Sequence, residues 1–243
     1  MDNTYIKRTH DKEIYLNENR LTDTKEYFKL LVNRSIDSGV LRPQSHVADI
    51  GCATGEFLYY LSQRSPQTKI YGADIISEFI DRAKESIPSG HFIEGSVTQS
   101  DLYPTNSFDI TYLLGVAQIF DQWEDIYENI VNWTKPGGRA YVFGPFNQYE
   151  VDVWVKYKLC SDPELEHREP GWNIISQKSI GTFLDKNPKV KNYQFTSFEM
   201  PFDIKAKKND PIRTWTFKQE DGQRMLTNGL SIIPQYAILE IEL

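Results

Sequence analysis

The sequence contains little cysteine and no long apolar run. Its 243 residues include only two cysteines, Cys52 and Cys160, which are too few and too far apart to indicate a disulfide framework or a zinc site. No stretch approaches the roughly 18 apolar residues that a membrane-spanning helix needs. The N-terminus is polar and lacks the apolar core of a signal peptide. We therefore expect a reduced, soluble protein of the cytoplasm, with no metal and no membrane partner.

The sequence also lacks an excess of basic residues. Its net charge is −7, and its pI is about 5.2. A protein that coats nucleic acid neutralises phosphates with clustered lysine and arginine, so a nucleic-acid partner is not expected. This balance still permits a local basic pocket. The chain is long enough to bury a full core as one domain over residues 1–243.

What the sequence does contain is a regular alternation of strand and helix patterns. Apolar residues at helical spacing predict a helix between Thr22 and Gly39. Strands and helices then alternate over residues 45–145, which predicts an α/β fold with a doubly wound, mostly parallel sheet and helices on both faces. Within that region, Ser77 is expected to cap the helix that follows the second strand.

Three segments lie outside this alternating core. Residues 1–40 are expected to form an N-terminal arm or lid with helices. Residues 147–175 have no clear periodicity and are interpreted as an insertion over the edge of the sheet. Residues 203–230 include E-D-G between two alternating runs, which is a hairpin signal. Because ligands of parallel sheets bind beyond the carboxyl ends of the strands, the two later segments are expected on the substrate side.

The run V-A-D-I-G-C-A-T-G at residues 47–55 places a tight glycine turn after a buried strand. A Walker phosphate loop requires lysine after the second glycine, and this chain has Glu56. A dinucleotide fingerprint would set the Glu56 carboxylate against a pyrophosphate at a helix N-terminus, which is electrostatically poor. The remaining interpretation is a ligand with a cationic end, for which Asp49 is a suitable partner.

This run resembles the first motif of the class I S-adenosylmethionine-dependent methyltransferases, which is an apolar strand, an acid and G-x-[GA]-x-G. Asp74 closes the next strand, where this family places an acid on the ribose. An acid there also suits NAD, so the loop, rather than Asp74, distinguishes the two cofactors. F-D-I-T-Y-L-L-G and W-T-K-P-G-G-R-A-Y-V are similar to the family's fourth-strand and fifth-strand segments. The resemblance implies a Rossmann-like, seven-stranded sheet with an antiparallel C-terminal strand and a small lid or hairpin.

The resemblance also implies the cofactor, S-adenosyl-L-methionine, and the residues that hold it. The loop would hold the methionine end, with Cys52 as a small side chain rather than a catalytic thiol. Asp74 would bind the ribose, and Ile75 would pack on the adenine. The full set of expected cofactor residues is Asp49, Gly51, Cys52, Ala53, Gly55, Asp74, Ile75, Ser96, Val97, Leu114 and Gly115.

The chain departs from the family pattern at two positions. Ser96 occupies a position where many members have an acid for the adenine amine. Gln118 occupies a position where a histidine is common, and a glutamine cannot act as a general base. Because a glutamine can still donate and accept hydrogen bonds, Gln118 is one candidate catalytic residue. The other is His167, the histidine of the 147–175 insertion and the first candidate for a general base.

The segments outside the core supply the candidates for the methyl acceptor. These are Asn147, Tyr149, Arg168, Trp172 and Arg213. Basic residues among them would suit an anionic small molecule. The C-terminal half is similar in style to methyltransferases of bacterial surface-polysaccharide clusters, which implies O-methylation of a sugar or of a phosphorylated or nucleotide-linked precursor. One alternative is methylation of a small carboxylic acid, and another is a catalytically inactive module that binds the cofactor. The protein is expected to be a monomer or a homodimer.

Overall fold

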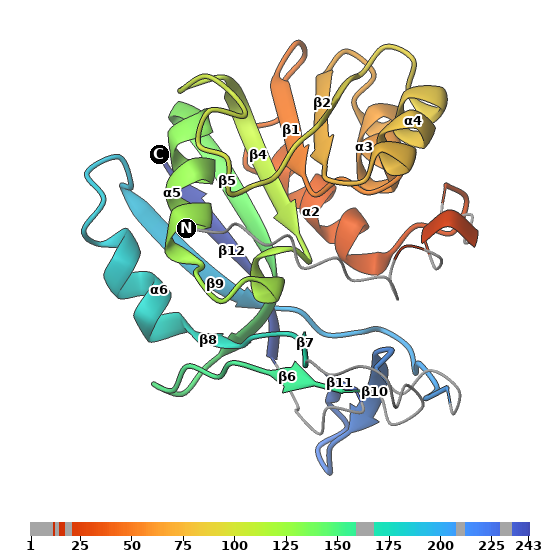
Figure 1. The fold of residues 1–243 in the computed structure, drawn as a ribbon, viewed down its shortest axis with the longest axis vertical. Coiled ribbons are helices and arrows are strands. Elements are labelled where there is room, and N and C mark those ends of the chain that lie inside the picture. The colour runs from red at the N-terminus through yellow and green to blue at the C-terminus, as the bar shows by residue number, and fades with distance from the viewer. Residues whose placement is uncertain (1–11, 13–14, 18–20, 159–167, 208–211, 229–234) are drawn as a thin grey trace.

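The computed structural model describes residues 12, 15–17, 21–158, 168–207, 212–228 and 235–243. These residues build one eight-stranded sheet with helices on both faces (Figure 1). The strand order along the sheet is β3-β2-β1-β4-β5-β12-β9, with β8 paired to the end of β5. The predicted α/β sheet is therefore confirmed, and β8 is an addition to the seven strands that were expected.

The first five strands run parallel to one another, and the last long strand, β12, runs antiparallel between β5 and β9. Parallel strands gather their carboxyl ends at one edge, where a ligand can meet the main chain of several strands at once. The strands of the sheet are β1 His46–Ile50, β2 Lys69–Asp74, β3 His91–Glu94, β4 Phe108–Leu114, β5 Thr134–Asn147, β8 Ile175–Ser176, β9 Asn192–Ser197 and β12 Gln235–Glu242.

Alternate residues of each strand face opposite layers, so the core consists of two apolar clusters. Val47 belongs to the cluster shared with α2, α3 and α4, whereas Ala48 belongs to the cluster shared with α5 and α6. This division explains the near-continuous apolar composition of the central strands. The helices are α2 Glu26–Asp37, α3 Glu56–Arg64, α4 Ser77–Ser86, the 3-10 helix η1 Ala117–Ile119, α5 Glu124–Trp133 and α6 Gln177–Leu184.

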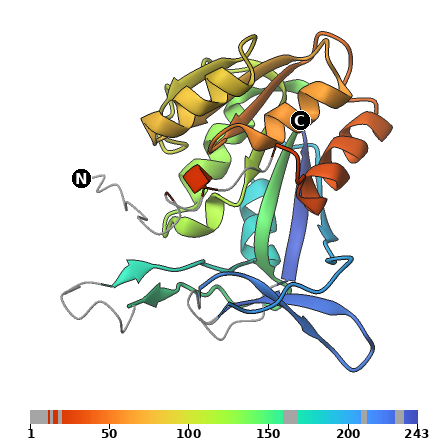
Figure 2. The same cartoon turned by 90° about the vertical axis from the view of Figure 1, so that its right-hand side faces the viewer.

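A small lobe extends beyond the carboxyl ends of the parallel strands (Figures 1 and 2). It contains the antiparallel pair β6 (Lys156–Tyr157) and β7 (Glu169–Pro170) and the hairpin β10 (Trp215–Lys218) and β11 (Arg224–Thr227). The hairpin predicted from E-D-G is thus present. Both peripheral segments lie on the side of the sheet where a ligand of a parallel sheet binds.

Two helix starts differ from the expectation. The helix predicted from Thr22 begins at Glu26, with Lys25 at its N-cap. The predicted cap at Ser77 is wrong, because Ser77 is already the first helical residue and Ile76 occupies the N-cap. The turn is held by Asp74 instead, since Oδ1 of Asp74 accepts a hydrogen bond from the Ile76 backbone N–H at 3.1 Å. No helix among the described residues is long and apolar enough to cross a membrane.

Candidate ligand site at the carboxyl edge of the sheet

The turn between β1 and α3 adopts a left-handed backbone at three positions. The φ angles are +78° at Gly51, +46° at Ala53 and +82° at Gly55. A Cβ atom at Gly51 would also overlap Val116 Cγ2, so glycine there serves both the backbone angle and the close approach of the loop after β4. The turn consequently presents bare main chain at the carboxyl edge, as the two glycines predicted.

Asp49 lies beneath this turn and is an incompletely satisfied acid. Its side chain is 3% exposed, and its Oδ1 has no hydrogen-bond partner among the described residues. Burial, and secondarily the charge of Asp74, raises the pKa of Asp49 to about 8, although Lys25 acts in the opposite direction. A buried acid oxygen without a donor is costly. The arrangement therefore favours a ligand that brings a donor or a positive charge.

Asp74 braces the turn as well as closing β2. Its Oδ2 accepts from the Ala53 N–H at 2.9 Å, and its Oδ1 accepts from the Ile76 N–H at 3.1 Å. Burial raises the pKa of Asp74, while hydrogen bonds from the main chain of Ala53, Ile76 and Ile75 lower it. A carboxylate has about four lone-pair positions, so Asp74 can still accept from ligand hydroxyls. Ile75 is half-buried beside it.

Cys52 is a packing residue within the turn. It is a free thiol with 4% exposure, and a Cβ at Gly72 would lie 2.9 Å from its sulfur. Burial and the neighbouring Asp49 and Asp74 raise the pKa of Cys52, which keeps the thiol protonated and unreactive. Only the main chain of Cys52 is therefore suited to ligand contact.

Ser96 and Val97 follow β3 and are held by bonds inside the protein. Ser96 Oγ pairs with the Thr98 hydroxyl at 2.8 Å and accepts from the Thr98 N–H at 3.2 Å. The Val97 carbonyl accepts from Asn129 Nδ2 at 2.8 Å, and its side chain is buried in the core. These bonds rigidify the loop and reduce what Ser96 can offer to a ligand.

Gln118 stands between the carboxyl ends of β4 and β5. A Cβ at Gly144 would lie 3.0 Å from its Oε1, and a Cβ at Gly115 would lie 3.6 Å from its Nε2. Gln118 is 9% exposed, and its Oε1 has no partner among the described residues. Leu114 is half-buried next to Gly115, whose φ is +76°. Glycines on both sides thus give the Gln118 amide room at this edge.

Helix α2 contributes residues to the site that the sequence did not indicate. Lys25 Nζ lies 3.4 Å from Glu56 Oε2, and the two side chains are 17% and 4% exposed. Tyr27 stacks on Phe143 of β5, with ring centroids 4.0 Å apart and an interplanar angle of 7°. Asp49 and Glu56 are among the charges that act on the Tyr27 hydroxyl, whose pKa is raised mainly by burial. In the sequence, only Lys25 before the helix and Glu56 after Gly55 could have indicated these contacts.

The residues expected to bind the methyl acceptor are less clearly gathered at one place than the residues expected to bind the cofactor. Asn147 caps its own turn, because its Oδ1 accepts from the Tyr149 N–H at 3.0 Å and its Nδ2 donates to the Val151 carbonyl at 2.7 Å. Tyr149 is 70% exposed. Arg168 is exposed on the small lobe, whereas Trp172 and Arg213 are half-buried there.

Histidine is absent from the carboxyl edge in the described part of the chain. His46 begins β1 and His91 begins β3, so both lie at the amino ends of their strands. The candidate base His167 lies outside the described residues. Within those residues, no group of three or more His, Cys, Asp and Glu could hold a metal ion.

Comparison with known proteins finds a family match within the alternating part of the chain. Residues 48–142 match a family described as methyltransferase domain. A curated relative, malonyl-[acyl-carrier protein] O-methyltransferase 2 of Ilyobacter polytropus, is 25% identical over 60% of this chain and 55% of its own length. A trans-aconitate 2-methyltransferase of Deinococcus radiodurans is 29% identical over 44% of this chain and 40% of its own length. The chain thus spans about half the length of these relatives.

The fold as a whole is similar to solved structures. Magnesium protoporphyrin IX methyltransferase from Synechocystis PCC 6803, solved with bound SAM, superposes with a TM-score of 0.57 and 12% identity. The match covers 98% of this chain and 93% of that one. At this identity, the comparison establishes a common fold.

Proposed function

We propose that the protein is a class I S-adenosylmethionine-dependent methyltransferase that transfers a methyl group to a small-molecule acceptor, and the match of residues 48–142 to a methyltransferase domain supports this proposal. The observation that carries this proposal is the unpartnered carboxyl oxygen of Asp49. Its buried Oδ1 lies under a turn of bare main chain without a partner among the described residues. A cofactor with a cationic amino-acid end supplies the donor that this oxygen lacks.

The residues around the turn fit this cofactor. Asp49 and the main chain from Gly51 to Gly55 would hold its methionine end, and Asp74 would accept from its ribose hydroxyls through the lone pairs that the backbone leaves free. Ile75 would pack on the adenine, with Ser96 and Val97 beyond it. Leu114 and Gly115 would line the end nearest the methyl group. Cys52 would contribute its main chain alone.

When bound, the cofactor supplies an electrophilic methyl group on a sulfonium sulfur. Transfer to an acceptor oxygen would form a C–O bond in place of the C–S bond, and the electron pair would remain on sulfur. The protein's contribution is alignment and exclusion of water. Tyr27 and Phe143, packed face to face beside the turn, would form an apolar wall for this step, and the Gln118 amide would orient the acceptor.

We infer that the acceptor group is a carboxylate. An alcohol must lose a proton during the transfer, whereas a carboxylate is already an anion at neutral pH and needs no base. Within the described residues the carboxyl edge has no histidine, and Gln118 cannot take a proton. The curated relatives are named for malonyl and trans-aconitate acceptors, both of which carry carboxyl groups. These observations support the carboxylic-acid alternative over a sugar hydroxyl of a polysaccharide precursor.

The acceptor class is tested by the chemistry of the product. The protein would be incubated with methyl-labelled S-adenosylmethionine and two panels of acceptors, small di- and tricarboxylic acids and phosphorylated or nucleotide-linked sugars. We expect label in a product that mild alkali hydrolyses, because a methyl ester is base-labile and a methyl ether is not. An alkali-stable product from the sugar panel would contradict the carboxylate assignment.

Calorimetry with S-adenosylmethionine and S-adenosylhomocysteine separates the remaining alternatives. Binding of both without transfer to any acceptor would favour the inactive cofactor-binding module. If neither binds, the methyltransferase proposal fails. Sedimentation of the purified protein would decide between the proposed monomer and homodimer, and the proposed cytoplasmic location would be read from cell fractionation.

A further inference from the structure

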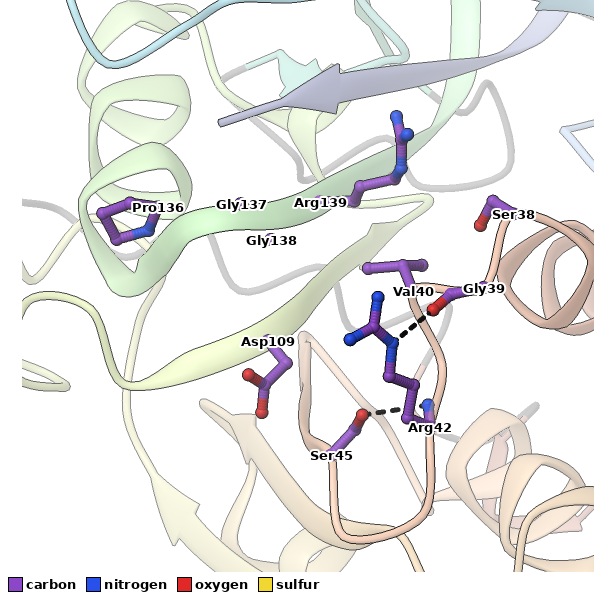
Figure 3. Close-up of a pocket in the computed structure, with 10 residues that line it drawn as sticks. All are labelled: Ser38, Gly39, Val40, Arg42, Ser45, Asp109, Pro136, Gly137, Gly138 and Arg139. Atoms are coloured by element: carbon purple, nitrogen blue, oxygen red, sulfur yellow. Dashed lines mark hydrogen bonds between the residues drawn. The ribbon is translucent and has the colours of Figure 1, made fainter.

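A second pocket opens at the opposite edge of the sheet from the glycine turn (Figure 3). Its volume is about 240 Å³. The loop between α2 and β1 contributes Gly39, Arg42 and Ser45, the start of β4 contributes Asp109, and the start of β5 contributes Gly137 and Gly138. Because β1, β4 and β5 are parallel, this pocket gathers their amino ends. It is therefore separate from the proposed methyl-transfer site.

The Arg42 side chain is exposed, and a single hydrogen bond holds the Nε side of its guanidinium group. Its Nε donates to the Gly39 carbonyl at 2.7 Å, and its backbone N–H donates to Ser45 Oγ at 3.0 Å. Its terminal nitrogens, Nη1 and Nη2, have no hydrogen-bond or ion-pair partner within the described residues. In Figure 3 they face the gap between this loop and the strands. Such a group binds an oxyanion with little further loss of side-chain entropy.

The other charges around the pocket are already paired. Lys135 Nζ lies 3.0 Å from both carboxylate oxygens of Asp109, and Oδ2 also accepts from the His46 N–H at 2.7 Å. Figure 3 shows the Arg139 side chain turned away from the pocket, toward β12, where its Nη1 lies 2.7 Å from Glu240 Oε1. The Asp109 charge is thus neutralised by Lys135, and the Leu243 oxygen that accepts from the Gly137 N–H also accepts from Lys191 Nζ at 3.0 Å. Among the charged lining residues, this leaves Arg42 as the one without an ion pair within the described chain.

Two neighbouring polar groups, His46 and Ser45, complete the surroundings of Arg42. His46 lies beside the pocket, and its pKa is lowered mainly by burial and then by the charges of Lys135 and Lys69, while Asp109 acts in the opposite direction. Ser45 Oγ accepts from the Arg42 N–H, so its hydroxyl hydrogen remains available to donate. The pocket therefore combines a fork of guanidinium donors with a neutral hydroxyl donor.

The walls near Arg42 are largely main chain. Gly39 and Gly137 have φ angles of +69° and +81°, and a Cβ at either would meet nothing within 4 Å. At Gly138 a Cβ would lie 2.6 Å from the Asp109 carbonyl oxygen, so glycine there permits β5 to approach β4. The three glycines thereby leave space beside Arg42, and Val40 and Pro136 are the apolar side chains among the residues that line the pocket.

We propose that this pocket binds a small oxyanion, a phosphate or carboxylate group, through the terminal nitrogens of Arg42 and the hydroxyl of Ser45. The guanidinium fork matches the spacing of two oxygens on either group. The site lies at the amino ends of β1, β4 and β5, and it requires neither the cofactor nor the methyl acceptor.

The test uses the whole chain, labelled with ¹⁵N and titrated with inorganic phosphate at constant ionic strength. We expect saturable shifts of the Gly39, Gly137 and Gly138 amides, with Gly51 and Gly55 unchanged. Arg42→Gln should weaken binding about tenfold, as expected for loss of a charged hydrogen-bonding group. Arg64→Gln is the matched control, since Arg64 is exposed on α3 and bonds to Tyr60 and Asn33.

A second arm replaces phosphate by acetate. Tighter binding of phosphate assigns a phosphate-bearing ligand, and tighter binding of acetate assigns a carboxylate. Arg42→Lys keeps the charge but removes the fork, so a loss close to that of Arg42→Gln would support two-oxygen recognition. Shifts that do not saturate, that are equal in Arg42→Gln, or that appear at Gly51 and Gly55 alone would overturn the proposal.

Discussion

The backbone N–H of Ala53 donates to Oδ2 of Asp74 at 2.9 Å, and this bond ties the turn after β1 to the end of β2. Ala53 has a left-handed backbone, with φ at +46°, which is unusual for a residue with a side chain. The bond from Asp74 helps to hold that conformation. Asp74 therefore has a structural role in the turn, in addition to its proposed contact with the ribose.

Removing this carboxylate should affect both roles. Asp74→Ala leaves the Ala53 and Ile76 N–H groups without their acceptor, so we expect a loss of about 1–3 kcal/mol in the free energy of unfolding. The dissociation constant for S-adenosylhomocysteine should rise by a similar free energy, measured by calorimetry well below the melting temperature. Asp81→Ala, on the exposed face of α4, is the control. Lower stability with unchanged affinity would show that Asp74 only braces the turn.

Asp49 predicts a pH dependence of cofactor binding. Because burial and Asp74 raise its pKa to about 8, Asp49 is largely protonated at pH 6 in the free protein. A cationic ligand favours the carboxylate, so binding should release a proton and tighten as pH rises, by at most about tenfold per pH unit. Calorimetry between about pH 5.5 and 7 keeps the ligand's amino group, whose pKa is about 8, almost fully protonated.

The same shift has a consequence for the free protein. An acid with a raised pKa contributes stability that is fully present below the unfolded value of 3.8 and is lost as pH rises toward about 8. Urea unfolding should show this decline, and Asp49→Asn should remove it while flattening the pH dependence of binding. A variant with the wild-type pH profile would exclude Asp49 as the titrating group.

Replacing Gly51 by alanine should lower the free energy of unfolding more than replacing Gly137, although the φ angles of the two glycines are similar. Gly51→Ala adds an overlap with Val116 Cγ2 to the backbone strain, whereas Gly137→Ala meets nothing within 4 Å. Strain alone is worth about 1–3 kcal/mol, and overpacking adds about 1–3 kcal/mol. Urea unfolding of both variants measures the difference. The double variant Gly51→Ala/Val116→Ala should recover part of the loss, and no recovery would count against the overlap.

Lys25 should influence the site from α2. Lys25→Met leaves Glu56 buried without the ion pair to Lys25, and we expect a loss of about 1–3 kcal/mol in unfolding free energy. Because Lys25 lowers the pKa of Asp49, its removal should also shift the pH profile of cofactor binding to higher pH. Lys29→Met, which removes a pair with Glu26 near the surface, serves as the control. An unshifted pH profile would contradict the electrostatic contact between Lys25 and Asp49.

The sequence was sufficient for features that depend on local pattern. The alternation of strands and helices predicted the parallel sheet, because each period reports burial within one element. The spacing of Gly51 and Gly55 predicted the turn, because only a few residue types tolerate a left-handed backbone. Asp49 and Asp74 could be placed at the same edge because parallel strands end together. The family resemblance rested on this same part of the chain, residues 45–145.

Only the tertiary structure decided which side chains share the edges of the sheet. The ion pair of Lys25 with Glu56 and the stacking of Tyr27 on Phe143 join α2 to the core across long stretches of sequence. The packing angle of α2 determines them, and no local pattern encodes it. The same holds for Arg42, whose open guanidinium depends on where Asp109 and Arg139 find their partners. Competition among charged and polar groups for the nearest partner is settled by the folded geometry.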